Sequence, residues 1–281
     1  MSEHLKRNQP AGMNIHWLFY SLDDFLDSQQ HIGFESIELW GGMPHVELDR
    51  LSYFDAKEIR YKIEKRGMKV HVFTPENCTY PYQFAAKGER YVQHTYDYFT
   101  NGLRMASELG CDVMAVNSGW GYWNENREEA WKRSREMLHR LAEFGETVGV
   151  TLAMETLRPQ ESQLVINIAD ARRMYDEVGH PNLKLMIDTC AMAVSGETIA
   201  QWFEEFGVEN IRDIHFIDGT PYGHLIWGDG NRDMTAYVHD LNTYGYEGYL
   251  GQEITDFKYF NNPGEADKKN FAAFQKFFVD D

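Results

Sequence analysis

Cysteine is scarce in this sequence, and its pattern excludes a common way of holding a small protein together. The 281 residues include three cysteines, at positions 78, 111 and 190, and no two of them stand in a C-x-x-C spacing. An odd number at wide spacing does not build a disulfide framework and is typical of a reducing compartment. We therefore expect a cytoplasmic protein.

Long apolar runs are also missing. No segment approaches the ~20 uninterrupted apolar residues that a membrane-spanning helix needs. The first 12 residues, MSEHLKRNQPAG, contain no apolar stretch of the kind found in signal peptides. We expect neither secretion nor a membrane partner, and we expect residues 1–12 to be a flexible N-terminus.

Positive charge is in the minority. The chain carries 27 Lys and Arg against 44 Asp and Glu, which gives a formal net charge of −17. Such a surface repels a phosphate backbone unless basic residues gather in a groove, and the sequence shows no basic run that could form one. Nucleic acid is disfavoured as a partner, and solubility is the simplest consequence of the acidity.

Apolar and aromatic residues, in contrast, are plentiful. Hydrophobic residues make up 43% of the chain, with 17 Phe, 16 Tyr and 7 Trp. A core built from them needs neither a disulfide nor a structural metal for stability. The apolar residues are spread evenly and no linker interrupts them, so we predict that residues 13–281 form a single domain.

Glycine marks a recurring pattern of helix, turn and strand. Helical stretches end at a Gly, which suits the left-handed conformation after a helix, and an apolar run follows within a few residues. The glycines lie 28 to 43 residues apart, at positions 33, 67, 110, 149, 179, 207 and 245. The runs after them contain SIELW, MKVHVF, DVMAV, VTLAM, LKLMI, IRDIHFI and YLGQEI.

One more strand is predicted at the start of the chain, over residues 13–20 (MNIHWLFY). Ser21 and Asp24 form a predicted capping pair for a helix that ends near Ile32. The total is eight βα units of similar size, which predicts an α/β fold, a (β/α)₈ TIM barrel, more strongly than a doubly wound open sheet.

Four residues with acidic or imidazole side chains end consecutive predicted strands. Active sites of such barrels lie at the carboxyl ends of the strands, so residues far apart in the sequence meet there. One strand-end Glu or Asp is more often a helix cap or an ion-pair partner than a ligand, but four at the same end favour a bound cation. The predicted metal ligands are Glu155, Asp188, His215 and Glu253.

The chemistry of these side chains narrows the ion. Three carboxylates and one imidazole are mostly oxygen donors, which suit Mn²⁺, Mg²⁺ or Co²⁺, and Zn²⁺ stays open. Asp213 and Asp218 are rivals for the contribution of the seventh strand. Asp213 shares the face of His215 but lies one layer lower, and Asp218 falls in the following loop, so His215 ranks first.

Several motifs in this chain resemble those of the xylose isomerase-like superfamily of sugar isomerases and epimerases. Within it, the sequence resembles fructoselysine 3-epimerase and the broader group of ketose 3-epimerases. The resemblance covers essentially the whole barrel. Its most specific parts are residues 37–45 (IELWGGMPH), 73–82 (FTPENCTYPY), 155–162 (ETLRPQES), 188–191 (DTCA), 215–218 (HFID) and 224–230 (HLIWGDG).

The resemblance implies roles for individual residues. It implies that Glu155, Asp188, His215 and Glu253 hold one divalent ion, for which Mn²⁺ ranks first, and that Glu161 contacts substrate hydroxyls. A ketose-like substrate would chelate the ion, and the ion would stabilise an enediolate formed when a proton leaves C3. Glu155 and Glu253 would serve as the acid and base, one removing that proton and the other returning it on the opposite face.

The chain departs from the tagatose and psicose 3-epimerase pattern at two places. Those enzymes carry a His three residues after the Asp ligand and an Arg six after the His ligand, whereas this chain has Ala191 and Pro221. A free ketohexose is therefore disfavoured, and a sugar bearing an amine, such as fructoselysine or psicoselysine, is favoured. His224 and Asp229, in the loop after the seventh strand, either supply the missing polar contacts or only order that loop.

Further candidates lie near the predicted mouth of the barrel. Substrate contacts are predicted for Trp40, Phe73, Trp120, His224 and Asp218, and aromatic residues at Tyr80, Tyr82, Trp123 and Trp227 crowd the same region. Strand-end aromatics can equally be packing residues, whereas those in Gly-containing loops need a substrate, a lid or a second subunit to cover them. His45, His71 and Glu76 also lie near the mouth in matching motifs, without an assigned role.

Other functions use the same fold. An aldose–ketose isomerase, an inosose-type dehydratase or a 3-keto-glycoside lyase would use similar chemistry, and product mass separates elimination from epimerisation. An abasic-site endonuclease would need more histidines and a basic surface, and a non-enzymatic barrel would bind no divalent metal. The exposed loop aromatics and the resemblance predict a homo-oligomer, a dimer or a tetramer, which light scattering would test.

Overall fold

Eight parallel strands close into a barrel in the computed structural model, which describes residues 3–49, 53–78 and 82–279. Each strand pairs with the next along the chain, and β8 pairs with β1 to close the ring. The predicted TIM barrel is confirmed, as a single domain. The strands are β1 (Pro10–Met13), β2 (Ser36–Gly41), β3 (Lys69–Pro75), β4 (Val113–Val116), β5 (Thr151–Met154), β6 (Leu183–Asp188), β7 (Ile211–His215) and β8 (Tyr249–Gly251).

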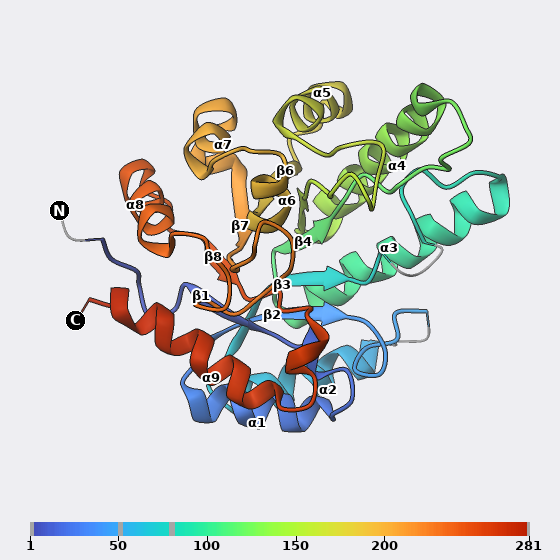
Figure 1. The fold of residues 1–281 in the computed structure, drawn as a ribbon. Coiled ribbons are helices and arrows are strands. Elements are labelled where there is room, and N and C mark those ends of the chain that lie inside the picture. The colour runs from blue at the N-terminus through green and yellow to red at the C-terminus, as the bar shows by residue number, and fades with distance from the viewer. Residues whose placement is uncertain (1–2, 50–52, 79–81, 280–281) are drawn as a thin grey trace.

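Helices surround the ring of strands (Figure 1). The α-helices within the described ranges are α1 (Leu22–Ile32), α2 (Tyr53–Glu64), α3 (Glu89–Leu109), α4 (Arg127–Val148), α5 (Ile168–Val178), α6 (Thr189–Val194), α7 (Ile199–Phe206), α8 (Met234–Tyr244) and α9 (Pro263–Phe274). Short 3₁₀ helices are η1 (Ile15–Trp17), η2 (Val208–Asn210), η3 (Phe257–Tyr259) and η4 (Gln275–Phe277). None of these helices has both the length and the apolar character needed to cross a membrane.

The predicted pattern of a left-handed glycine after each helix is confirmed at five of the seven positions; Gly67 lies three residues after α2, and Gly207 follows α7 with ψ at 138°. Gly33, Gly110, Gly149, Gly179 and Gly245 each follow a helix directly and adopt a left-handed conformation, with φ between 59° and 104°. Residues with a side chain are strained there, so glycine sets where each helix stops and the chain turns back to the barrel. The capping pair of α1 is also present, because Ser21 and Asp24 each accept a backbone N–H of the other.

The start of the chain differs from the prediction. The first strand is Pro10–Met13 instead of residues 13–20, because the chain leaves the extended conformation at Asn14 and turns into η1. The barrel therefore begins inside the segment predicted to be flexible. Leu5 is buried, and its backbone N–H donates to Phe277, which ties the two ends of the chain together. Figure 1 shows both ends on the same side of the molecule.

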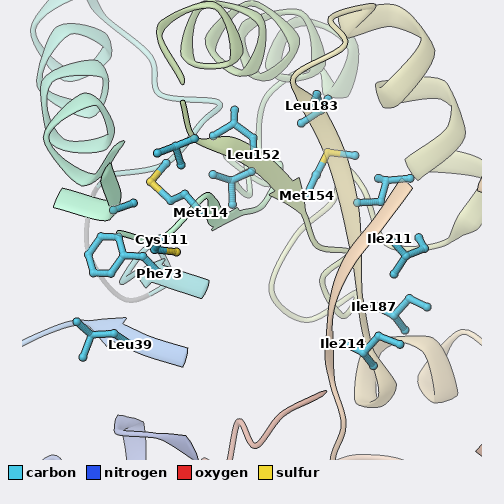
Figure 2. Packing of buried hydrophobic residues seen from close by; sticks show 14 of the residues in the cluster. Leu39, Phe73, Cys111, Met114, Leu152, Met154, Leu183, Ile187, Ile211 and Ile214 are labelled. Carbon is cyan, nitrogen blue, oxygen red and sulfur yellow. The ribbon is translucent and has the colours of Figure 1, made fainter. Parts of the chain in front are cut away.

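The two faces of the strands serve different purposes. Alternate strand residues, among them Leu39, Phe73, Met114 and Leu152, point outward and pack between the barrel and the helices (Figure 2). Inside the barrel a smaller apolar group from β3–β6 fills one half: Val72, Val113, Ala115, Ala153 and Met186. The half next to β2, β7 and β8 holds polar side chains, and these lead up to the site described below.

Candidate metal centre and active site

The four predicted ligands lie at one end of the barrel. Asp188 and His215 are the last residues of β6 and β7, and they are partners in the parallel register. Glu155 directly follows β5, and Glu253 lies two residues beyond β8. All four therefore stand at the carboxyl ends of the strands, where TIM barrels carry their active sites.

Two overlapping groups at this rim have the composition of metal sites. One ligand atom from each of Glu155, His215 and Glu253 lies within 4.8 Å of the others, and the same holds for Asp188, His224 and Glu253. Because Glu253 belongs to both groups, the four predicted ligands and His224 form one continuous set. We call these five residues the rim cluster.

The imidazole rings lie between the carboxylates. Nδ1 of His215 is 2.7 Å from Oε1 of Glu155 and 3.2 Å from Oε2 of Glu253. Nδ1 of His224 is 2.8 Å from the same Glu253 oxygen, and its Nε2 is 3.4 Å from Oδ2 of Asp188. Both rings are buried, whereas the side chains of Glu155 and Glu253 are partly exposed, so solvent reaches the carboxylates but not the imidazoles.

The rim cluster fits a divalent cation. Four of its buried atoms have no hydrogen-bond partner among the described residues, although their neighbours are close: Oε1 of Glu155, Nδ1 of His215, and Nδ1 and Nε2 of His224. These atoms face one another across a shared polar space, and buried polar atoms left without a partner are costly. A divalent ion would satisfy them, and a set of three carboxylates with imidazole suits Mn²⁺, Co²⁺, Mg²⁺ or Zn²⁺.

The two glutamates differ in proton affinity. Burial, opposed in part by His215, raises the pKa of Glu155 to about 7. Burial acts in the same direction on Glu253, but the charges of His215 and His224 outweigh it and hold the pKa of that carboxyl well below its usual range. Burial lowers the pKa of His215, and Glu253, Glu38 and Glu155 together overcome this and raise it well above the ordinary value. Without a bound ion, Glu155 therefore holds a proton more tightly than Glu253 does.

Glu161, the predicted substrate contact, forms an ion pair with Arg158, a residue without a predicted role. Its Oε2 accepts both the backbone N–H and the Nε–H of Arg158, at 3.0 and 2.9 Å, and its Oε1 faces a terminal nitrogen of the same guanidinium. Both side chains are partly exposed. Any contact of Glu161 with substrate would therefore be made by an ion pair instead of a free carboxylate.

Asp218 has a different task from the predicted substrate contact. Its buried carboxylate accepts backbone N–H groups from Gly219, Gly228, Gly230 and Arg232, at 2.7 to 3.0 Å. With both oxygens used in this way, the side chain folds the loop after β7 instead of facing a ligand. Asp229 also orders the region, because it accepts the hydroxyl of Tyr259 at 2.7 Å. His224, in the same loop, joins the rim cluster.

The predicted mouth aromatics mostly belong to the packing. Phe73 is fully buried in the outer core, so its predicted substrate contact is wrong. Trp40 is also buried, and its Nε1–H donates to Glu76 at 3.0 Å. Trp227 packs on Phe216 with ring centroids 4.9 Å apart.

The remaining loop aromatics are more accessible. Trp120 is half-buried and lies edge-on to Tyr122, and Trp123 is exposed. Tyr82 stacks on Tyr98, and Tyr80 lies outside the described residues. Trp120 is thus the predicted aromatic substrate contact that keeps an accessible side chain.

The three candidates without an assigned role, His45, Glu76 and His71, make contacts with the surrounding protein. His45 lies between Asn14 and the backbone carbonyl of Tyr20, at 2.8 and 2.9 Å, and burial lowers its pKa. Glu76 accepts the N–H groups of Trp40 and Cys78. The expectation that His71 lies near the mouth is wrong. This residue is near the amino-terminal start of β3, where a shift in register with β2 leaves it unpaired and its ring stacks on Tyr249, with centroids 3.9 Å apart.

Sequence reasoning missed one acidic residue of the site. Glu38, in the middle of β2, is fully buried, and its Oε1 lies 2.9 Å from Nε2 of His215. Glu38, Asp213 and His215 form a third group with the composition of a metal site, and this group lies directly beneath the rim cluster. Burial, followed by the charge of Glu38, raises the pKa of Asp213 well above its usual value. The sequence contained a signal for this role, because Glu38 is a charged residue inside the apolar run SIELW. The strand has no exposed face that would explain a charge at this position.

Comparison with known proteins gives relatives along nearly the whole chain. Fructoselysine 3-epimerase of Escherichia coli O157:H7 is 28% identical over 259 residues, which are 92% of this chain and 93% of that protein. L-ribulose 3-epimerase of Mesorhizobium japonicum is 30% identical over 129 residues, 44% of this chain and 41% of that enzyme. The predicted resemblance to these epimerases is confirmed.

Solved structures agree on the fold. The 3-keto-D-glucoside 4-epimerase of E. coli superposes with a TM-score of 0.80 at 17% identity, covering 96% of this chain and 99% of that one. D-psicose 3-epimerase of Clostridium cellulolyticum gives a TM-score of 0.79 at 14% identity, covering 96% and 100%. The model of the xylose isomerase-like TIM barrel family matches residues 26–276. The chain therefore belongs to the xylose isomerase-like TIM barrel family.

Proposed function

We propose that this protein is a divalent-metal-dependent sugar epimerase that inverts C3 of a ketose or ketosamine. The observation that carries the proposal is the meeting of Glu155 and Glu253 at one imidazole nitrogen of His215. These glutamates follow β5 and β8, which are not neighbours in the barrel. Two carboxyl groups brought to one point from separate parts of the wall can address one carbon from different sides.

The ion would be held by Glu155, Asp188, His215 and Glu253, with His224 beside them, and Mn²⁺ is the form we favour. When bound, a divalent ion supplies Lewis-acid stabilisation of the negative charge that develops on substrate oxygens as the C3 proton leaves. The chain itself supplies the proton transfer. Glu155 and Glu253, which both approach Nδ1 of His215, would form the pair in which one carboxyl takes a proton while the other gives one.

Two observations favour an amine-bearing sugar as substrate. The similarity to fructoselysine 3-epimerase spans 93% of that protein, whereas the similarity to L-ribulose 3-epimerase spans 41% of that one. Ala191 and Pro221 also replace the His and Arg that the resemblance associates with free ketohexoses. We therefore propose a ketosamine such as fructoselysine, with psicoselysine as the product.

Deuterium exchange at C3 tests the proposal. Fructoselysine, fructose, psicose and tagatose would each be incubated with the Mn²⁺-loaded protein in D₂O and followed by NMR. We expect incorporation at C3 of the ketosamine together with formation of its C3 epimer. Glu155→Gln and Glu253→Gln should each reduce this exchange by at least 10²-fold, because proton transfer by a positioned side chain contributes 10²–10⁴-fold.

Glu143→Gln, at an exposed position of α4, is the matched control and should exchange at the wild-type rate. Wild-type exchange in Glu155→Gln would contradict the two-carboxyl scheme. Exchange at C1, or a product lighter by one water or one aglycone, would instead indicate the isomerase, dehydratase or lyase alternatives.

A further inference from the structure

The imidazole of His215 also has a close partner on its buried side, away from the other residues of the rim cluster. Its Nε2 lies 2.9 Å from Oε1 of Glu38, and the side chains of both residues are 1% exposed or less. Glu38 belongs to β2, whereas His215 belongs to β7, with β8 and β1 between them in the ring. The Glu38 side chain therefore reaches across the interior of the barrel to meet the imidazole.

Two further residues keep the Glu38 carboxylate in place. The hydroxyl of Thr74, on the neighbouring strand β3, donates to Oε1 of Glu38 at 2.6 Å. Gly251, on β8, leaves the space that the carboxylate occupies. A Cβ at position 251 would lie 1.9 Å from Oε2 of Glu38 and 3.3 Å from Cδ2 of His215. Asp213 lies next to Glu38 and His215, and its two carboxylate oxygens have no hydrogen-bond partner among the described residues.

The geometry has a direct consequence for metal binding. A neutral imidazole carries one N–H, and the group that accepts this hydrogen decides which nitrogen keeps a free lone pair. A carboxylate that accepts from Nε2 leaves the lone pair on Nδ1, which is the nitrogen next to Glu155 and Glu253. Partners of this kind around metal-binding histidines fix both the tautomer and the ring orientation.

We propose that Glu38 is a positioning residue for the candidate metal centre. It accepts the Nε2–H of His215, and so presents Nδ1 to the ion, while Thr74 and Gly251 fix the carboxylate in that position. The inference rests on the metal site of the proposed function and assigns no direct contact between Glu38 and substrate. Glu38 acts through His215, so its replacement should weaken metal binding before it affects any chemical step.

Metal affinity of purified variants tests this role. Mn²⁺ would be titrated into chelator-treated protein by calorimetry for the wild type, Glu38→Ala, Glu38→Gln and Glu197→Gln. Loss of such a partner typically costs 10–100-fold in metal affinity, which is the loss expected for Glu38→Ala. Glu38→Gln keeps an oxygen that can accept the Nε2–H and should lose less than Glu38→Ala. Glu197 is the control position, because its half-buried carboxylate lies on the outer side of the barrel and accepts the N–H groups of Ile168 and Trp202. Glu197→Gln should bind Mn²⁺ like the wild type.

Nitrogen NMR supplies a readout that a purely structural role would not change. In Zn²⁺-loaded protein labelled with ¹⁵N-histidine, His215 should show a protonated Nε2 in the wild type and a mixture of tautomers in Glu38→Ala. If Glu38→Ala does not fold, Thr74→Val takes its place, because this variant removes one donor to Glu38 and leaves His215 unchanged. Its Mn²⁺ affinity should fall as well, but by less than that of Glu38→Ala.

The possible failures are distinguishable. A folded Glu38→Ala or Thr74→Val protein with wild-type Mn²⁺ affinity and an unchanged His215 tautomer would overturn the positioning role. A wild-type protein that binds no divalent ion would instead overturn the metal site of the proposed function. A wild type that binds Mn²⁺ but epimerises none of the tested sugars would overturn the activity and leave the role of Glu38 supported by the affinity series.

Discussion

At the scale of single residues, position along a strand decided which roles could be predicted. Glu155, Asp188 and His215 stand at or just after strand ends, so the rule that barrel sites gather there was enough to predict their convergence. Glu38 lies within a strand and reaches its partner across the barrel, and neither feature follows from sequence spacing. Phe73 was misassigned because it alternates outward into the core instead of pointing at the mouth.

His71 gives a prediction about pH at this scale. Burial, reinforced by Lys69, lowers its pKa to about 4 against an ordinary value of 6.5. Below pH 6.5 the unfolded chain takes up a proton that the folded chain refuses, so the folded state loses stability as pH falls from 6.5 towards 4. We expect His71→Phe, which keeps a ring against Tyr249, to remove this loss and to gain about 2 kcal/mol relative to wild type between pH 7 and pH 5.

Urea unfolding at the two pH values measures this difference. His31→Phe, at an exposed position, serves as the control for the exchange of a histidine for a phenylalanine. Parallel stability curves for wild type and His71→Phe would show that burial of His71 does not govern the acid sensitivity.

At the scale of elements, the seam of the barrel depends on one buried carboxylate. Asp267 of α9 accepts four hydrogen bonds, at 2.6 to 2.8 Å, from His16, Trp17, Gln29 and Gln252. These donors come from η1, from α1 and from the segment after β8, so one side chain joins the last helix to both strands that close the ring. The same contacts explain why residues 13–20 do not form a strand, since the polar groups of His16 and Trp17 are drawn to α9.

Asp267→Asn should therefore destabilise the whole barrel. The substitution places an NH₂ group against two donors inside the core, and the expected cost is roughly 3 kcal/mol. Equilibrium urea unfolding would show a lower midpoint at an unchanged slope. Glu265→Gln, two residues earlier in the first turn of the same helix and half-exposed, should change the midpoint little. Equal effects of the two variants would contradict the proposed role of Asp267 in closing the ring.

At the scale of the whole molecule, the regular features were predictable and the loops were not. The pattern of a glycine after a helix and an apolar run after the glycine repeats seven times and, with one strand before it, gives eight strands, so the barrel and the order of its strands followed from the sequence. The loop after β7 carries no such period. Its fold depends on Asp218 gathering four backbone N–H groups, which is why His224 could not be assigned to the rim cluster in advance.

The carboxylates of the rim cluster lead to a final prediction, which concerns the stability of the protein with and without a bound divalent ion. Asp188, Glu155 and Glu253 meet in a largely buried site, where the repulsion between carboxylates is offset in part by His215 and His224 and would be offset further by a divalent cation. Asp188→Asn removes one of these charges and retains an N-cap for α6, because Asn caps helices as well as Asp does. Without metal, we expect this variant to unfold at the same temperature as the wild type or higher.

Saturating Mn²⁺ should reverse the order, since a ligand present at 100 times its dissociation constant stabilises the folded state by about 2.7 kcal/mol and the variant loses an oxygen donor. Thermal unfolding of both proteins in EDTA and in Mn²⁺ provides the four values needed. An Asp188→Asn protein that is less stable than wild type by the same amount in both conditions would contradict charge compensation by the ion, because the loss would then come from packing or capping alone.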